Sequence, residues 1–280
     1  MRFRLIALDA DGTALDPDGR VRPAVRAAVG AAQQRGVRVV LCTGRRYRTA
    51  LPILEALELD GAAVVHNGAV VKDAHNGATL HHNYLPRDLY PVALSIMRKL
   101  GPPLVYVDHY HENLDLVTET PERSHPYQEE YWRDNTDVGR VVDSLDRPPS
   151  DALVLMSCMA DRESCQALRQ EISAALGDRV RTNLLVNKNY RGYILETVSS
   201  SSGKWPALLQ VAAGEGISAE EILAIGDDEN DAEMIAHAGL GVAMRNAVET
   251  ARTAAKYITG SNAEDGVAQA IERFVLRGQG

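Results

Sequence analysis

Short apolar runs alternate with amphipathic stretches along most of this chain of 280 residues. Residues 4–8 form a largely apolar run, and residues 24–32 place alanine and valine at the spacing of one helix face. Residues 37–41 form a second apolar run, which would close a right-handed βαβ unit. Residues 62–65 predict a third strand after a helical stretch that ends near residue 59. This alternation predicts a parallel sheet with helices on both faces.

The chain between residues 84 and 189 has a different character. It contains several prolines, most of the tyrosines and a polar tract over residues 119–137. It is large enough to be an inserted domain with its own small sheet. The elements expected within it are a helix over 88–100, strands over 104–107 and 152–159, and a helix over 163–176.

Strand and helix alternate again after residues 193–195. The sequence therefore predicts an α/β protein of two domains. A doubly wound, Rossmann-like parallel sheet would comprise residues 1–83 and 190–280, and a smaller α/β domain would comprise residues 84–189. The last part of the first domain would contain strands over 221–225 and 240–243, helices over 231–237, 248–255 and 263–274, and a short apolar segment over 256–258.

The first apolar run ends in two carboxylates, Asp9 and Asp11, followed by Gly12 and Thr13. In open α/β sheets, ligands bind at the carboxyl ends of the strands. Two carboxylates there can divide the chemistry, one as a nucleophile and the other as a proton donor and acceptor. An Asp-Gly pair alone is also typical of a surface turn, so the function depends on the rest of the chain.

Three further polar clusters follow strands or begin helices. In Thr43-Gly44-Arg45, the Thr43 hydroxyl and the Gly44 N–H can bind a phosphoryl oxygen near a helix N-terminus. Arg45 could reach a substrate anion or pair with carboxylates of the inserted domain. Lys204 begins a predicted helix, where a cation is unfavourable with respect to the helix dipole, and this indicates a compensating anion. Residues 226–231, Gly-Asp-Asp-Glu-Asn-Asp, follow the strand predicted over 221–225.

In this order and spacing, the four clusters resemble those of the haloacid dehalogenase (HAD) phosphatase superfamily. The combination of Asp-x-Asp-Gly-Thr with Gly-Asp-x-x-Asn-Asp is the specific part, and the resemblance covers essentially the whole chain. The insertion resembles the type C2B cap domain of the Cof-type branch. The resemblance implies a HAD-like core and Mg²⁺-dependent hydrolysis of a small phosphorylated metabolite, such as a sugar phosphate, through an aspartyl-phosphate intermediate.

The resemblance also implies a role for each catalytic position. Asp9 would attack phosphorus, and Asp11 would protonate the leaving oxygen and then deprotonate water. The Asp9 carboxylate, the Asp11 main-chain carbonyl and Asp227 would hold one Mg²⁺. Asp231 would orient Lys204 or support the metal site by interacting with the metal ligands without binding the metal itself. The residues that would bind the substrate phosphate are Thr43, Gly44, Lys204 and Asn230.

Some of these residues also have simpler interpretations. Asn230 and Asp231 are residue types that cap a following helix. In similar chains a pair like Asn67-Gly68 lies near the substrate, but this pair is equally a simple turn. The chain departs from the family at Trp205-Pro206, where Lys204 is usually followed by glycine and a helix former. Pro206 is tolerable in a first helical turn.

Composition narrows the class of protein further. A formal net charge of −8 argues against general nucleic-acid binding, which requires a basic face. No apolar stretch approaches the length of a membrane span. The three cysteines, Cys42, Cys158 and Cys165, lack the spacing of a disulfide framework, so reduced thiols in a soluble cytoplasmic protein are expected.

Two alternative functions remain open at this stage. The same nucleophile could serve a phosphomutase, which returns the phosphoryl group to its substrate. The chain could also be a non-catalytic regulator that binds a phosphorylated metabolite, although the intact Asp9, Asp11, Lys204 and Asp227 favour catalysis. The motifs concern only the phosphate, so the substrate itself would be selected by residues of the inserted domain. No sequence feature fixes the oligomeric state.

Overall fold

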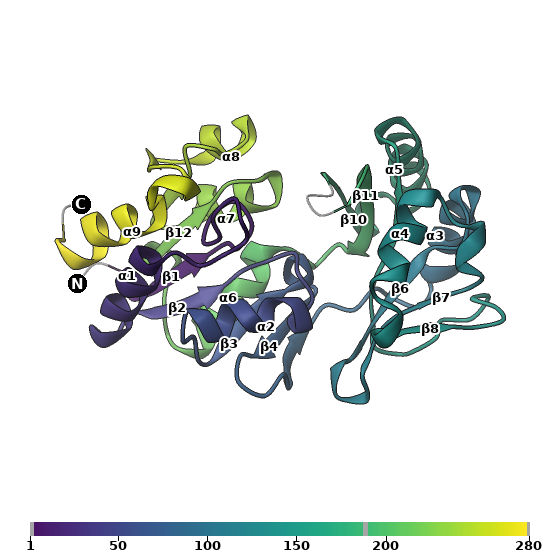
Figure 1. Ribbon diagram of the computed structural model, residues 1–280, viewed down its shortest axis with the longest axis horizontal. Helices are drawn as coiled ribbons and strands as arrows, with labels where there is room; N and C mark the ends of the chain where they lie inside the picture. Colours follow the sequence, from purple (N-terminus) through teal and green to yellow (C-terminus); the bar gives the residue numbers. More distant parts are fainter. Residues whose placement is uncertain (1–2, 187–189, 279–280) are drawn as a thin grey trace. The chain divides into compact units, whose positions relative to one another are not determined.

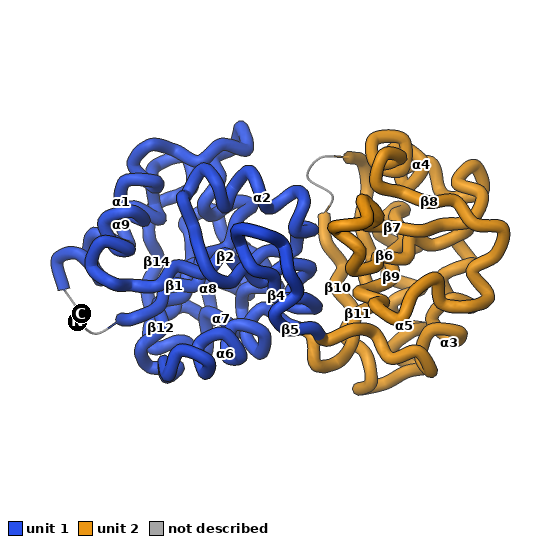
Figure 2. The backbone as a smooth tube through the Cα atoms, turned by 90° about the horizontal axis from the view of Figure 1, so that it is seen from below, with its two compact units in different colours: residues 1–82, 203–280 blue, residues 83–202 orange. Residues whose placement is uncertain are grey.

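The structure is a computed structural model that describes residues 3–186 and 190–278 (Figure 1). The chain divides into two compact units (Figure 2). Unit 1 comprises residues 1–82 and 203–280, and unit 2 comprises residues 83–202. The predicted fold class, a Rossmann-like α/β core with an inserted α/β domain, is confirmed.

Unit 1 is built on a parallel five-stranded sheet, which is buried between helices as such sheets usually are. Figure 2 shows α1 and α9 on one side of this sheet and α6 and α7 on the other. The strands, in their order across the sheet, are β14 (Tyr257–Ile258), β13 (Leu240–Ala243), β12 (Ile222–Gly226), β1 (Leu5–Leu8) and β2 (Arg38–Leu41). The helices are α1 (Pro23–Gln34), α2 (Tyr47–Ala56), α6 (Lys204–Gly214), α7 (Ala232–His237), α8 (Glu249–Ala254) and α9 (Gly266–Ile271).

Side chains of β1 alternate between the two faces of this sheet, as a strand requires. Leu5 and Ala7 pack against α6, where Trp205 and Leu208 belong to the same buried cluster. The expected strands over 62–65 and 240–243 are found at those residues. A smaller antiparallel sheet extends the first one through a bridge between Cys42 and Val64. Its strands are β3 (Ala62–Val65), β4 (Val70–Asp73) and β5 (Thr79–His82).

Unit 2 contains a six-stranded sheet that is antiparallel except between β7 and β8. Helices α3 and α5 cover one face, where Met97 and Leu168 share a buried cluster with Val105 and Met156. Helix α4 lies on the opposite face, because Tyr131 contacts Tyr106, a neighbour of Val105 that points the other way. The strands in order are β10 (Val180–Val186), β11 (Tyr193–Ser199), β9 (Leu153–Ala160), β6 (Leu104–His109), β7 (Leu114–Thr118) and β8 (Gly139–Val141), and the helices are α3 (Tyr90–Met97), α4 (Pro126–Arg133) and α5 (Arg162–Leu176).

The second boundary of the inserted unit differs from the one expected from the sequence. The pattern assigns residues 190–280 to the first domain, but β11 pairs antiparallel with β9 and β10 inside unit 2. An apolar run predicts a strand but does not predict which sheet the strand joins. In addition, the expected elements did not include β10, which pairs with β11. The chain therefore crosses between the units after Ser202 rather than near residue 190. Ser202 Oγ donates to the carbonyl of Asn83 (3.2 Å), so the two crossing segments lie side by side.

Two further expectations concern the whole chain. None of the helices within the described residues is long and apolar enough to span a membrane. The longest described helix, α5, has 15 residues, whereas a span needs about 20. Cys42, Cys158 and Cys165 are all free and buried.

Candidate active site

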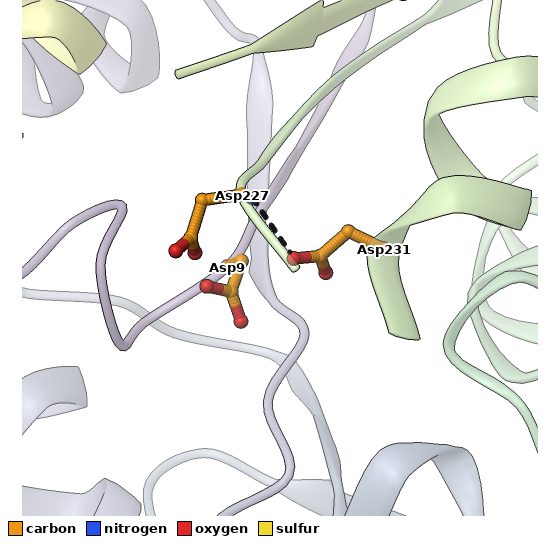
Figure 3. A group of neighbouring side chains, drawn as sticks. All are labelled: Asp9, Asp227 and Asp231. Carbon is orange, nitrogen blue, oxygen red and sulfur yellow. Dashed lines mark hydrogen bonds between the residues drawn. The ribbon is translucent and has the colours of Figure 1, made fainter. Parts of the chain in front are cut away.

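Three polar segments meet at the carboxyl edge of the unit 1 sheet. Leu8 of β1 pairs with Leu41 of β2 and with Ile225 of β12, so the residues that follow these strands come together. Figure 3 shows the result for the acids: Asp9, Asp227 and Asp231 converge, with carboxylate oxygens within 4.8 Å of one another. All three are buried. The sequence predicted that these aspartates share one site, and the sheet brings them together.

Lys204 binds two of these acids directly. Its Nζ donates to Asp9 Oδ1 and to Asp231 Oδ1, each at 2.7 Å, and its side chain is 1% exposed. Lys204 is the first residue of α6, which therefore carries the ammonium group into the site. Burial by itself lowers the pKa of Lys204, but the charges of Asp231 and Asp9 outweigh it and raise this pKa above its ordinary value. Lys204 is therefore a cation at physiological pH.

Asp231 holds the loop that follows β12. Its Oδ2 accepts the N–H groups of Asp227 (3.0 Å, dashed in Figure 3) and Asp228 (3.1 Å). Its other oxygen accepts from Lys204, so both oxygens are used by the protein. A Cβ at Gly226 would lie 2.5 Å from Asp231 Cγ, so only glycine fits there. Asp231 thus positions Lys204 and the Asp227 backbone. Because both of its oxygens already accept hydrogen bonds, Asp231 is poorly suited to bind a metal directly.

The site has an excess of negative charge. Three buried carboxylates and one ammonium group leave a net charge of −2 if every acid is ionised. Burial raises the pKa of Asp9 well above its ordinary value, and Asp231 and Asp227 raise it further against the opposing effect of Lys204. A divalent cation would offset this charge, and the carboxylates of Asp9 and Asp227 are the hard oxygen donors that Mg²⁺ prefers. The donor set of the site therefore fits Mg²⁺.

Asp227 is fixed by the loop that carries Asp9. Thr13 Oγ1 donates to Asp227 Oδ1 (2.9 Å). Gly12 has a φ of +87°, and a Cβ there would lie 2.2 Å from Asp227 Oδ2. Asn246, which the sequence did not indicate, donates from Nδ2 to the Gly12 carbonyl (2.8 Å). Gly12 is therefore required by the close approach of Asp227 as well as by its backbone conformation.

A second set of polar side chains surrounds Thr43. Its hydroxyl oxygen accepts from the Arg45 N–H (3.1 Å), which leaves the O–H proton to donate elsewhere. Asn67 has a φ of +53°, and its N–H donates to the Thr43 carbonyl (3.0 Å). Asn67 Oδ1 accepts from Asn230 Nδ2 (2.8 Å), while Asn230 Oδ1 is buried without a hydrogen-bond partner among the described residues. The structure thus places Asn67 beside Asn230 and Thr43, so the Asn67-Gly68 pair is more than a surface turn.

Asp11 lies outside the buried acid cluster. Arg45 donates to both of its oxygens, from Nε to Oδ2 (2.7 Å) and from Nη2 to Oδ1 (2.6 Å). The Asp11 and Arg45 side chains are 37% and 28% exposed. The sequence suggested a substrate anion or an acid of the inserted domain as the partner of Arg45, but its partner here is Asp11 of the same unit.

The two residues after Lys204 are accommodated without distorting the site. Trp205 is 8% exposed within the core under α6, and its ring stacks on His237 at a centroid distance of 6.1 Å. Pro206 falls in the first turn of α6, where its missing N–H has no intrahelical acceptor to lose.

Asp228 precedes a short turn, and its carboxylate accepts the Glu229 N–H (2.8 Å).

Comparison with known proteins identifies relatives over the whole chain. Residues 6–271 match the family model of haloacid dehalogenase-like hydrolases. The chain is 33% identical over 280 residues to YxeH of Bacillus subtilis, covering 98% of this chain and 99% of that one. It is 29% identical over 274 residues to the 5-amino-6-(5-phospho-D-ribitylamino)uracil phosphatase YcsE of B. subtilis, covering 98% and 96%. A crystal structure of a haloacid dehalogenase-like hydrolase from Bacteroides thetaiotaomicron superimposes with a TM-score of 0.80 at 29% identity, covering 97% and 99%.

Proposed function

The chain belongs to the haloacid dehalogenase-like hydrolases, and from that premise we propose that it hydrolyses a small phosphorylated metabolite with Mg²⁺ through an aspartyl-phosphate on Asp9. The enzyme is a phosphatase, and a sugar phosphate or a similar monoester is the proposed substrate class. YcsE acts on a phosphorylated ribityl compound, which supports a phosphorylated polyol or sugar. The observation that carries the proposal is the buried cluster of Asp9, Asp227, Asp231 and Lys204.

The nucleophile must overcome charge repulsion. A phosphate monoester dianion repels a carboxylate, so donors and cations have to offset the charge that gathers in the transition state. Lys204 holds Asp9 Oδ1 at 2.7 Å and fixes the direction of the carboxylate. Attack by the second oxygen of Asp9 would form the acyl phosphate and break the bond between phosphorus and the leaving oxygen.

Asp11 would transfer the protons in both halves of the reaction. It would donate a proton to the leaving oxygen as the alcohol departs. It would then accept a proton from the water that attacks phosphorus, which frees the Asp9 carboxylate and releases inorganic phosphate. The position of Asp11 beside the buried cluster, with a partly exposed carboxylate, suits exchange of protons with substrate and water.

The carboxylates of Asp9 and Asp227 and the main-chain carbonyl of Asp11 would hold the Mg²⁺. When bound, the metal supplies positive charge that stabilises the transferring phosphoryl group. The phosphate itself would be bound by Thr43, Gly44, Lys204 and Asn230. Thr43 keeps a free O–H donor and Asn230 keeps one N–H beyond the bond to Asn67.

Release of inorganic phosphate from a panel of metabolite phosphates, with Mg²⁺, tests the proposal directly. The panel should include sugar phosphates and ribityl phosphates. Asp9→Asn should lower release by at least about a thousandfold, because the neutral amide cannot form the acyl phosphate. Asp228→Asn is the matched control, since Asp228 only caps a turn beside the site, and it should retain activity.

Metal dependence is the second part of the same experiment. Excess EDTA should abolish release and Mg²⁺ should restore it. Ca²⁺ should substitute poorly, because it takes more oxygen ligands at longer distances and would misalign Asp9. Release above a trace by Asp9→Asn, or full activity in excess EDTA, would contradict the proposal. Interconversion of substrate isomers without phosphate release would identify a phosphomutase instead.

A further inference from the structure

The contact between Arg45 and Asp11 is more specific than an ordinary surface ion pair. Nε and Nη2 of the guanidinium donate side by side to the two carboxylate oxygens, at 2.7 and 2.6 Å. This paired arrangement fixes the plane of a carboxylate as well as its position. The Asp11 side chain is 37% exposed, so burial alone does not fix its rotamer. The position of Arg45 therefore contributes to the orientation of Asp11.

Arg45 is itself held at three points within unit 1. Its N–H donates to Thr43 Oγ1 (3.1 Å), and its carbonyl accepts from the His66 N–H (2.9 Å). Its Nη1 donates to the carbonyl of Thr49 in α2 (3.2 Å). The backbone and the guanidinium are thus both fixed, so Arg45 can act as a rigid support for the carboxylate next to it.

We propose that Arg45 is a positioning residue that aims the Asp11 carboxylate at the leaving oxygen of the substrate. The inference rests on the proposed function, in which Asp11 transfers the protons. Proton transfer needs the acid within hydrogen-bond reach of the leaving oxygen, and efficiency falls when that geometry is lost. A carboxylate has about four acceptor sites, so the two bonds from Arg45 do not by themselves fill the Asp11 carboxylate.

This role predicts a dependence on the leaving group. Phenyl phosphate and 4-nitrophenyl phosphate have nearly the same shape, but the phenolate is the more basic leaving group and needs a proton more. If the Asp11 carboxylate is misoriented, kcat/KM should therefore fall more for phenyl phosphate than for 4-nitrophenyl phosphate. A role of Arg45 in phosphate binding or in folding would lower both values by the same factor.

The test compares Arg45→Gln, Arg45→Lys, Asp11→Asn and the double variant Asp11→Asn/Arg45→Gln with both aryl phosphates and Mg²⁺. Arg45→Gln should lower kcat/KM for phenyl phosphate about tenfold more than for 4-nitrophenyl phosphate. Arg45→Lys should keep this unequal loss, because an ammonium group supplies the charge but cannot fix the carboxylate plane. The double variant should show the same ratio as Asp11→Asn alone, since both changes remove one function.

Arg22→Gln is the matched control. Arg22 makes the same paired contact with Asp265 through Nε and Nη2, at 2.5 and 3.2 Å, and its side chain is similarly exposed. Arg22→Gln therefore removes a comparable ion pair from the surface. It should leave the ratio of the two kcat/KM values unchanged. Equal losses for the two substrates in Arg45→Gln, or no loss, would overturn the inference while the proposed function stands. No unequal loss in Asp11→Asn would instead contradict the proton-transfer role of Asp11 itself.

Discussion

At the scale of single residues, the chain places Asp9 where its charge is unfavourable. Burial and two neighbouring aspartates raise the pKa of Asp9, and Lys204 only partly compensates. Such an arrangement reduces the stability of the folded protein, and it makes sense only where function requires the charge. The same crowding creates an affinity for a divalent cation. Stability and metal binding at this site are therefore two consequences of one electrostatic cause.

Asp9→Asn should consequently stabilise the metal-free protein. The folded state keeps the Asp9 proton at pH values where the unfolded chain, with an ordinary pKa of 3.8, has lost it. The free energy of unfolding of the wild type therefore falls as the pH rises above that value. In EDTA at neutral pH, the variant should therefore be more stable than the wild type. The advantage should shrink as the pH approaches the ordinary value.

Urea unfolding at neutral and acid pH, with EDTA and with Mg²⁺, measures this difference. Mg²⁺ should stabilise the wild type more than the variant, because the variant has lost one carboxylate ligand. Asp228→Asn, which removes a less buried acid from the neighbouring loop after β12, should show neither effect. A variant that is less stable than the wild type in EDTA at neutral pH would show that the Asp9 charge does not destabilise the fold.

The sequence was informative about residues whose chemistry is tied to strand ends. Asp9, Thr43 and Asp227 follow three neighbouring strands, so the order of the sheet alone brings them together. The partner of Arg45 could not be predicted in this way. It depends on which rotamer a long side chain adopts in a loop, and several anions were within its reach. The contact of Asn246 could not be predicted either, because Asn246 approaches Gly12 from a distant part of the chain.

At the scale of elements, prediction succeeded where the hydrophobic period was clear. Helix α5 and strand β9 begin and end within a residue or two of the expected positions. The expected elements did not include α4, which lies in a polar tract and buries only Gln128 and Trp132. They also did not include β10, whose residues are mostly half-exposed and mix polar with apolar types. Antiparallel strands of this kind carry a weak sequence signal. Because β10 was not expected, its neighbour β11 was assigned to the first domain instead of unit 2.

The loops that follow β1 and β12 approach each other so closely that a side chain at Gly12 would overlap Asp227. Gly12→Ala should therefore shift the Asp227 carboxylate and lower kcat/KM by at least about a hundredfold, in addition to a backbone cost of about 1–2 kcal/mol at positive φ. Gly19→Ala is the matched control, because Gly19 has a φ of +75° with nothing within 4 Å of the added Cβ. It should show the same backbone cost in urea unfolding with unchanged kcat/KM. Equal activity in both variants would show that the contact with Asp227 does not matter for the chemistry.

At the scale of the whole molecule, the chain separates into two units with independent cores. The cluster beneath α6 contains residues of unit 1 alone, and the cluster beneath α3 and α5 contains residues of unit 2 alone. Every residue proposed to touch phosphate or metal belongs to unit 1. These contacts are common to all phosphorylated substrates and cannot distinguish between them. Discrimination among leaving groups is therefore proposed to reside in unit 2.

Replacing residues 83–202 with a short Gly-Ser linker tests this division. The crossing segments lie side by side at Asn83 and Ser202, so a short linker can join β5 to α6 without strain on either element. The shortened chain should fold, because its core is intact, and should still release phosphate from 4-nitrophenyl phosphate in a reaction that Asp9→Asn abolishes. The spread of kcat/KM across the panel of metabolite phosphates should shrink to about tenfold, since only the phosphate is still recognised. If the shortened chain instead ranks the panel as the full chain does, with all values lowered by one factor, specificity resides in unit 1.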